Sequence, residues 1–230
     1  MAIPGLNDKY LRPVVFAATG LFLCLVGMYF IPAAELPFKI AYPVGCLAIA
    51  GIWLCPWQMC LALAFSAAGD YMGSCGSFIG QMGMFATAHV LMVLYFIRRY
   101  LNKVERDRKL TGKAKGFLAM VLFCSLALLA VSLLRIAPEA PAGMIRIGVG
   151  AYSVIICTML VTAMLQRSSL FALGAVLFVF SDFILAWNMF VEQIPHAGLM
   201  IMIPYYLGQW LLFIRSSRFR IAHPLRLLRF

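Results

Sequence analysis

The sequence predicts an all-α membrane protein, a polytopic bundle of eight transmembrane helices. Of its 230 residues, 64% are hydrophobic and only 12% are charged, and the mean hydropathy is +0.95. A soluble domain is about 45–50% apolar and about 25% charged. The surplus apolar surface exceeds what one soluble core can bury. We therefore expect a single integral membrane domain, residues 1–230, whose solvent is largely lipid.

Eight apolar runs are long enough to be membrane spans, since a helix needs about 20 apolar residues, with a range of about 17–25, to cross a bilayer. Pro56 marks the break between the second and third runs. The first run is longer than the apolar core of a signal peptide, so we expect it to stay uncleaved. The eight predicted spans are Val14–Ile31, Phe38–Leu54, Trp57–Met72, Ser77–Ile97, Lys115–Leu134, Met144–Leu165, Ser169–Val191 and Gly198–Ile214.

The basic residues predict that both termini are cytoplasmic. With eight spans, sixteen of the 19 Lys and Arg residues fall on one side, in the pattern that positions cytoplasmic loops. The net charge of +11 therefore reflects topology and anionic lipid, and we do not expect nucleic-acid binding. The sixteen are Lys9, Arg12, Arg98, Arg99, Lys103, Arg106, Arg108, Lys109, Lys113, Lys115, Arg167, Arg215, Arg218, Arg220, Arg226 and Arg229.

Two aspartates, Asp70 and Asp182, lie inside apolar runs. A carboxylate at membrane depth costs roughly 3 kcal/mol on insertion scales, so two such residues indicate a function. Each lies 13 residues after the predicted start of its span, about 20 Å from the cytoplasmic face. Their similar depth predicts a working pair. It also suggests a parallel 4+4 internal repeat with halves 1–113 and 114–230.

Other polar groups lie in the spans and are candidates to join this pair. His89 and Tyr206 each lie eight residues from the end of their predicted helices, about 12 Å deep. Several of the polar residues have simpler possible roles: a carbonyl contact for the histidine, packing for Tyr205 and Tyr206, and helix–helix bonding for Gln81 and Asn188. Arg146 either extends to the interface or holds a lipid phosphate. The cysteine and histidine spacings show no metal-ligand pattern, so we expect no metal or cofactor.

At these residues the sequence resembles the lysoplasmalogenase, or YhhN-like, family of membrane proteins. One shared element is a Gly-Asp followed by a Phe-rich run and an Ala-His, here Gly69-Asp70, Phe78, Gly80, Phe85 and Ala88-His89. A second, more specific element is Gly174, Phe178, Ser181-Asp182, Ala186, Pro195, Tyr205-Tyr206 and Gln209. A weaker match is Tyr152, Met159 and Ala163.

The resemblance implies hydrolysis of the vinyl ether bond of lysoplasmalogen, a lysophospholipid, to a fatty aldehyde and glycerophosphocholine or glycerophosphoethanolamine. Protonation of the alkene needs a positioned acid, and two close carboxyls in an apolar site can share a proton. We expect one of Asp70 and Asp182 to be the acid and the other to activate water; either assignment is open. The resemblance also makes Tyr152, Ser181, His89, Tyr205, Tyr206 and Gln209 candidates to orient water or substrate.

Three other classes of function use similar features. A proton-coupled transporter also carries intramembrane acids and internal repeats. An intramembrane aspartyl protease uses two such acids, but its Pro-Ala-Leu element is missing here. The third class is a non-catalytic lipid-binding protein. We expect a multi-pass protein of a bacterial inner membrane, or of the endoplasmic reticulum in a eukaryote.

Overall fold

The computed structural model describes residues 8–31, 37–101 and 112–222, with side chains for 12–31, 37–101, 112 and 116–217. Every regular element in these ranges is helical, which confirms the all-α prediction. Part of the predicted basic side lies outside the described residues: Lys103, Arg106, Arg108, Lys109, Arg226 and Arg229, together with the side chains of Lys9, Lys113, Lys115, Arg218 and Arg220.

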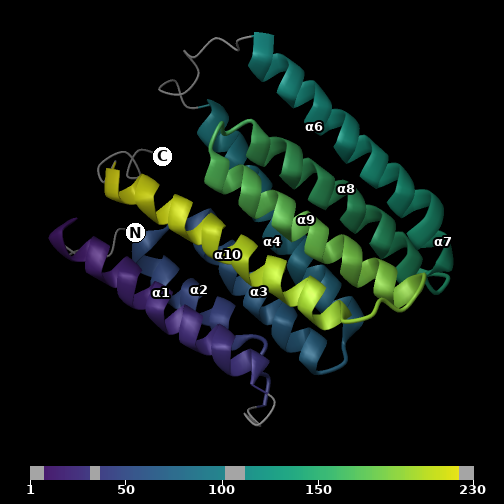
Figure 1. Ribbon diagram of the computed structural model, residues 1–230, viewed down its shortest axis with the longest axis horizontal. Helices are drawn as coiled ribbons and strands as arrows, with labels where there is room; N and C mark the ends of the chain where they lie inside the picture. Colours follow the sequence, from purple (N-terminus) through teal and green to yellow (C-terminus); the bar gives the residue numbers. More distant parts are fainter. Residues whose placement is uncertain (1–7, 32–36, 102–111, 223–230) are drawn as a thin grey trace. The chain divides into compact units, whose positions relative to one another are not determined.

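The chain divides into two compact units, residues 1–91 with 209–230 and residues 92–208. The first unit contains α1 (Asp8–Phe30), α2 (Tyr42–Leu54) and α3 (Trp57–Ser74). Within it, α2 packs against both α1 and α3, and Figure 1 shows these three helices as neighbours. The helices α4 (Phe78–Leu101) and α10 (Ala197–Ala222) contribute residues to both units.

Pro56 separates α2 from α3 as predicted. Cys55 ends α2 in an extended conformation, with φ −111° and ψ 156°, which is what a following proline imposes. Pro56 has no backbone N–H to continue the helix and stands at the N-cap of α3. The third span therefore begins at Trp57, the residue that the sequence predicts.

Two glycines one turn apart bring α3 and α4 together in the first unit. A Cβ on Gly69 would lie 2.9 Å from the Phe85 ring, and one on Gly73 would lie 2.7 Å from the Gln81 carboxamide. Small residues at the interface between membrane helices allow such a close approach of their backbones. Because Gly69 faces Phe85 and Gly73 faces Gln81, the helices run antiparallel, and His89 is level with Phe65 on α3.

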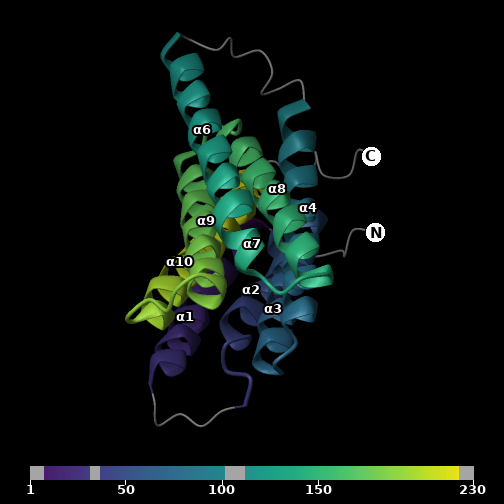
Figure 2. The ribbon, with the colours of Figure 1, turned by 90° about the vertical axis from the view of Figure 1, so that its right-hand side faces the viewer.

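The second unit contains α6 (Gly112–Val131), the π-helix η1 (Ser132–Ile136), α7 (Ala137–Glu139), α8 (Met144–Met164) and α9 (Ser169–Phe190). Here α8 packs against both α6 and α9, as Figure 2 shows. The π-helix has a local cause. Pro138 cannot donate to the carbonyl four residues before it, so the hydrogen bonds change spacing just upstream. The helix begun by α6 thus continues through η1 to Glu139, beyond the predicted end at Leu134.

Small residues also join α9 to α10 in the second unit. A Cβ on Gly208 would lie 2.9 Å from the Gly174 carbonyl oxygen. The Ser181 hydroxyl donates to the Ile201 carbonyl at 2.9 Å. These contacts fix an antiparallel register between the two helices, in which Tyr205 is level with Leu177.

Six helical segments are long and apolar enough to cross a membrane, within the described part of the chain. They are Arg12–Phe30, Phe78–Leu101, Gly116–Glu139, Met144–Met164, Ser169–Phe190 and Ala197–Ser217. The second predicted span is shorter than expected, because residues 37–41 form turns and α2 has only 13 residues. At 1.5 Å per residue that is about 20 Å, short of a hydrocarbon core of about 30 Å. The remaining predicted span, α3, has 18 residues but is more polar and is not among the six.

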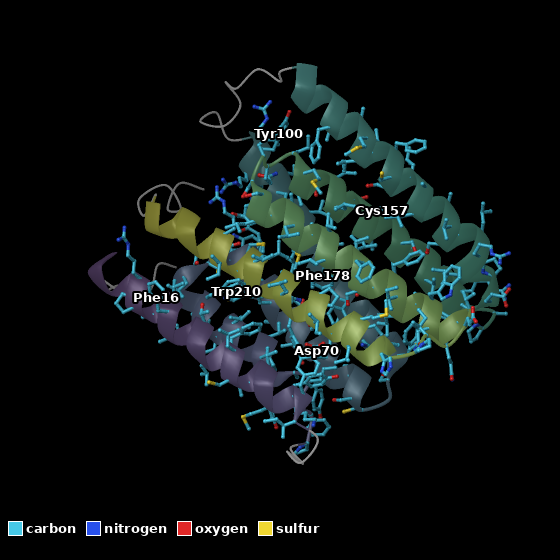
Figure 3. The ribbon with its side chains drawn as sticks, viewed as in Figure 1. Phe16, Asp70, Tyr100, Cys157, Phe178 and Trp210 are labelled. Carbon is cyan, nitrogen blue, oxygen red and sulfur yellow. The ribbon has the colours of Figure 1, made fainter. Side chains whose placement is uncertain are left out.

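Large apolar side chains are exposed on the spanning helices, as lipid contact requires. Phe16 on α1, Phe123 on α6 and Ile147 on α8 are each more than 70% exposed. Figure 3 labels Phe16 on α1. Exposed apolar surface of this extent marks a membrane-facing protein rather than a soluble monomer. The chain is therefore a multi-pass helical membrane protein.

We predict that Gly208→Ala destabilises the fold by about 1–3 kcal/mol, since its methyl group would overlap the backbone of α9. Thermal unfolding of the purified protein in detergent measures this. Gly27→Ala on α1 is the matched control, because nothing lies within 4 Å of the added carbon. Equal melting temperatures for Gly208→Ala and the native protein would contradict the close α9–α10 contact.

Candidate active site

Asp70 is buried in the first unit, with 2% of its surface exposed. It is the fourteenth of the 18 residues of α3, so only four residues follow it before the helix ends. By the helical rise it lies about 6 Å from that end. Figure 3 labels its side chain on α3.

His89 of α4 lies in the same unit and is fully buried. Its Nδ1 lies 2.7 Å from the Phe85 carbonyl oxygen. A carbonyl only accepts, so Nδ1 carries the proton and donates, and Nε2 of the neutral ring is an acceptor. The predicted carbonyl contact is therefore present, and it also fixes the ring. The same Phe85 covers Gly69, next to Asp70.

Ser66 and Gln209 add unsatisfied polar groups to the first unit. The Ser66 hydroxyl lies one turn before Asp70 on α3 and, among the described residues, has no hydrogen-bond partner. Five helical hydroxyls each bond a carbonyl four residues back, those of Thr87, Ser153, Thr158, Thr162 and Ser216, whereas Ser66 and, in the second unit, Ser125 do not. Both amide atoms of Gln209 also lack a partner in the described part of the chain. Buried groups of this kind are satisfied by water or ligand.

Tyr29 of α1 lies within electrostatic range of Asp70, so the carboxylate charge acts on the Tyr29 hydroxyl. Neither Tyr29 nor Ser66 was predicted from the sequence as a neighbour of Asp70. A serine one helical turn from an intramembrane acid is a signal that could have identified Ser66. For Tyr29 the contact depends on how α1 is placed within its unit, and no local signal shows that.

Asp182 lies on α9 in the second unit and is partly buried. The hydroxyl of Tyr152 on α8 donates a hydrogen bond to its Oδ2 atom. Ser181 does not bond this carboxyl; its hydroxyl donates to the Ile201 carbonyl. Tyr152 is thus a direct partner of the acid, and Ser181 ties the helix that carries the acid to α10.

Tyr205 and Tyr206 are buried beside this helix, each with at most 3% of its surface exposed. The Tyr205 ring meets the Phe178 ring edge-on, with centroids 5.4 Å apart, and lies 5.3 Å from the Tyr206 ring. Their rings therefore pack in the second unit, with Phe178 one turn before Asp182 on α9.

Arg146 closes the end of α7. Its Nη2 donates to the carbonyls of Pro138 at 2.8 Å and Ala140 at 3.0 Å, and its Nε donates to Ala140 at 3.2 Å. Helix ends leave carbonyls that such a side chain can satisfy. This supports a structural role, while the contact with a lipid phosphate stays a prediction.

The predicted site residues thus fall into two groups. Asp70, His89 and Gln209 belong to the first unit, whereas Asp182, Tyr152, Ser181, Tyr205 and Tyr206 belong to the second. The pairing of Asp70 with Asp182 stays a prediction. Within residues 8–31, 37–101 and 112–222, no three His, Cys, Asp or Glu side chains are grouped as metal ligands would be.

Comparison with known proteins gives a consistent result. Residues 37–216 match the model of the YhhN family. The chain is 32% identical over 161 residues to lysoplasmalogenase TMEM86B of Homo sapiens, covering 68% of this chain and 62% of that protein. The Rattus norvegicus lysoplasmalogenase TMEM86B is 34% identical over 167 residues, covering 70% of this chain and 62% of that protein. The matches thus span less than two thirds of these relatives. No solved structure matches the chain.

We predict that Tyr152→Phe destabilises the protein by about 1–3 kcal/mol, because the partly buried Asp182 carboxyl loses a hydrogen bond. Thermal unfolding in detergent measures the loss. Tyr100→Phe, at an exposed position on α4, is the matched control. The assignment of Tyr152 as the partner of Asp182 is wrong if the two variants melt together.

Proposed function

The chain belongs to the YhhN family, and we propose that it is a membrane hydrolase that cleaves the vinyl ether bond of lysoplasmalogens. The products are a fatty aldehyde and glycerophosphocholine or glycerophosphoethanolamine. The observation that carries this proposal is the 32–34% identity to proteins named lysoplasmalogenase. The transport alternative gains nothing from these relatives, which carry an enzyme's name.

The reaction begins with proton transfer from a carboxylic acid to the alkene carbon that is not bonded to oxygen. This step gives an oxocarbenium ion, which a nearby carboxylate stabilises as in glycoside hydrolysis. Water adds to the cationic carbon and loses its proton to the carboxylate. The resulting hemiacetal then collapses to the aldehyde and the glycerol hydroxyl, so the net reaction consumes one water. We assign the acid and the base to Asp70 and Asp182, in either order.

The neighbouring polar groups are suited to holding the water and the glycerol oxygens. Ser66 and Gln209 are buried with unmet hydrogen bonds among the described residues, and a water or substrate oxygen would satisfy them. The bond from His89 Nδ1 to Phe85 leaves Nε2 as an acceptor in the neutral ring. Tyr205 and Tyr206 would shape the site on the Asp182 side, with the Tyr152 bond holding that carboxyl.

Similar local geometry around the two acids supports a duplicated origin. Helices α3 and α9 begin at Trp57 and Ser169, so each acid is the fourteenth residue of its helix. In the α3–α4 pair, the His89 ring is level with a residue five positions before Asp70. In the α9–α10 pair, the Tyr205 ring is level with a residue five positions before Asp182. His89 is level with Phe65 and Tyr205 with Leu177. We propose a 4+4 parallel repeat, with halves 1–113 and 114–230.

We also propose that all eight helices cross the membrane, with both termini cytoplasmic, and that this membrane is a bacterial inner membrane or, in a eukaryote, the endoplasmic reticulum. The charge distribution of the sequence supports the orientation. For the short helix α2, local thinning of the bilayer or snorkelling of flanking residues would make up the missing length.

We predict that Asp70→Asn and Asp182→Asn each lower aldehyde release from lysoplasmalogen by at least about 100-fold, the usual worth of a positioned general acid or base. Purified protein in detergent is assayed for free aldehyde. Glu192→Gln, an exposed carboxyl at the end of α9, is the matched control and should keep native turnover. The acid–base assignment fails if both Asn variants fold and turn over like the native protein.

We further predict that hydrolysis in D₂O gives an aldehyde with one deuterium on the carbon next to the carbonyl. Protonation of the alkene carbon places the solvent proton there. Mass spectrometry of the aldehyde, trapped as a stable derivative, measures the label. Unlabelled aldehyde from complete turnover would rule out protonation at that carbon, and ordinary ester-linked lysophospholipid should release no aldehyde.

A further inference from the structure

The segment before α2 lies against the end of α3 that is nearer to Asp70. The Phe38 ring packs on the ring of Tyr71, the residue after Asp70, with centroids 4.8 Å apart. Phe38 adopts a left-handed backbone conformation, with φ 55°, which is uncommon for a bulky residue and is retained only where the surroundings hold it. Residues 37–41 are therefore a built part of the surroundings of Asp70.

Contacts with Tyr29 and Ile31 help to fix Lys39 in this segment. Its ammonium lies 5.9 Å from the centre of the Tyr29 ring and donates to the Ile31 carbonyl at 3.3 Å. The segment itself is anchored by the Tyr42 hydroxyl, which donates to the Pro37 carbonyl at 2.7 Å. A cation over an aromatic face is stabilised without giving up its charge. The positive charge is thus held at a defined place.

Tyr29 connects this charge to the acid. The Lys39 ammonium lies over the Tyr29 ring, and the Tyr29 hydroxyl is within electrostatic range of the Asp70 carboxylate. All three residues belong to the first unit. Lys39 lies beside the end of α3, and Asp70 is buried about one turn inside that helix. The Tyr29 ring lies between the two in this chain of interactions.

We propose that Lys39 binds the phosphate of the lysophospholipid substrate and thereby places the vinyl ether at Asp70. The proposal rests on the proposed function and names the head-group site for it. Seven covalent bonds separate the phosphorus from the alkene carbon that is protonated, a span of about 8–9 Å. A lysine ammonium recognises a phosphate as a point charge. From the end of α3 inward, Lys39 comes before Asp70, in the same order as the phosphate and the vinyl ether along the lipid.

Two other cations of the described chain, Arg146 and Arg99, have contacts in the second unit. The Arg146 guanidinium bonds the carbonyls at the end of α7, and the Arg99 guanidinium lies over the Phe171 ring at 5.5 Å, in the second unit. Within the first unit, Lys39 is linked to Asp70 through Tyr29.

The test compares a substrate with and without the phosphate. We expect Lys39→Met to raise the KM for lysoplasmalogen about tenfold, as loss of one charge-assisted contact does. The KM for 1-alkenylglycerol, which has no phosphate, should change less than twofold, and Lys39→Arg should restore most of the difference. Arg135→Gln, which removes an exposed cation of η1, is the matched control and should leave both KM values at the native level. Equal changes for the two substrates would overturn the proposal.

A binding experiment tests the role of Lys39 independently of the proposed hydrolase activity. Purified protein is titrated with ester-linked lysophosphatidylethanolamine and with monoacylglycerol, following intrinsic tryptophan fluorescence. Lys39→Met should weaken binding of the first lipid about tenfold and leave the second unchanged. Should the native protein release no aldehyde, the hydrolase proposal fails while this comparison still decides the role of Lys39. Inorganic phosphate is titrated as competitor: displacement at equal concentration would show a free-phosphate site and overturn the lipid assignment.

Discussion

A carboxyl group in an apolar helix needs polar neighbours, and much of this structure provides them. For Asp182 that neighbour is the Tyr152 hydroxyl. The next residue on α8, Ser153, bonds Ser132 of the π-helix. That π-helix arises because Pro138 removes a backbone donor. Pro138 thus acts on the position of Tyr152. The π-helix that it causes holds Ser132 against Ser153, and Ser153 is in the turn of α8 from which Tyr152 reaches Asp182.

Close helix packing is the second condition, because polar contacts of about 3 Å require short distances between helix axes. Gly69 and Gly73 let α4 approach α3. Gly208 does the same for α10 on α9. Without a hydrophobic driving force between helices in lipid, such approach depends on small residues and interhelical bonds. The glycine beside Asp70 is therefore a packing requirement as well as part of the shared sequence element.

The helices could be predicted from the sequence where a signal is local. Pro56 fixed the start of α3, and the start of α9 at Ser169 was also correct. The length of α2 was overestimated, because the apolar residues 38–41 form turns that hydropathy does not distinguish from helix. Asp70 and Asp182 stood out as isolated charges, and resemblance alone pointed to Tyr152. Tyr29 and Lys39 could not be found, since their relation to Asp70 arises from the placement of α1 and the segment before α2 in the tertiary structure.

The position of Asp70 along α3 also bears on the choice of substrate. Counted from the start of the helix the acid looks deep, at about 20 Å, but α3 has only 18 residues, so its other end is about 6 Å away. In a lysophospholipid the vinyl ether lies directly below the glycerol, near the polar head, whereas the middle of the chain is saturated hydrocarbon. On the proposed function, an acid one turn inside α3 meets the reactive bond, and the substrate enters from the side of residues 37–41, where Lys39 and Tyr71 lie.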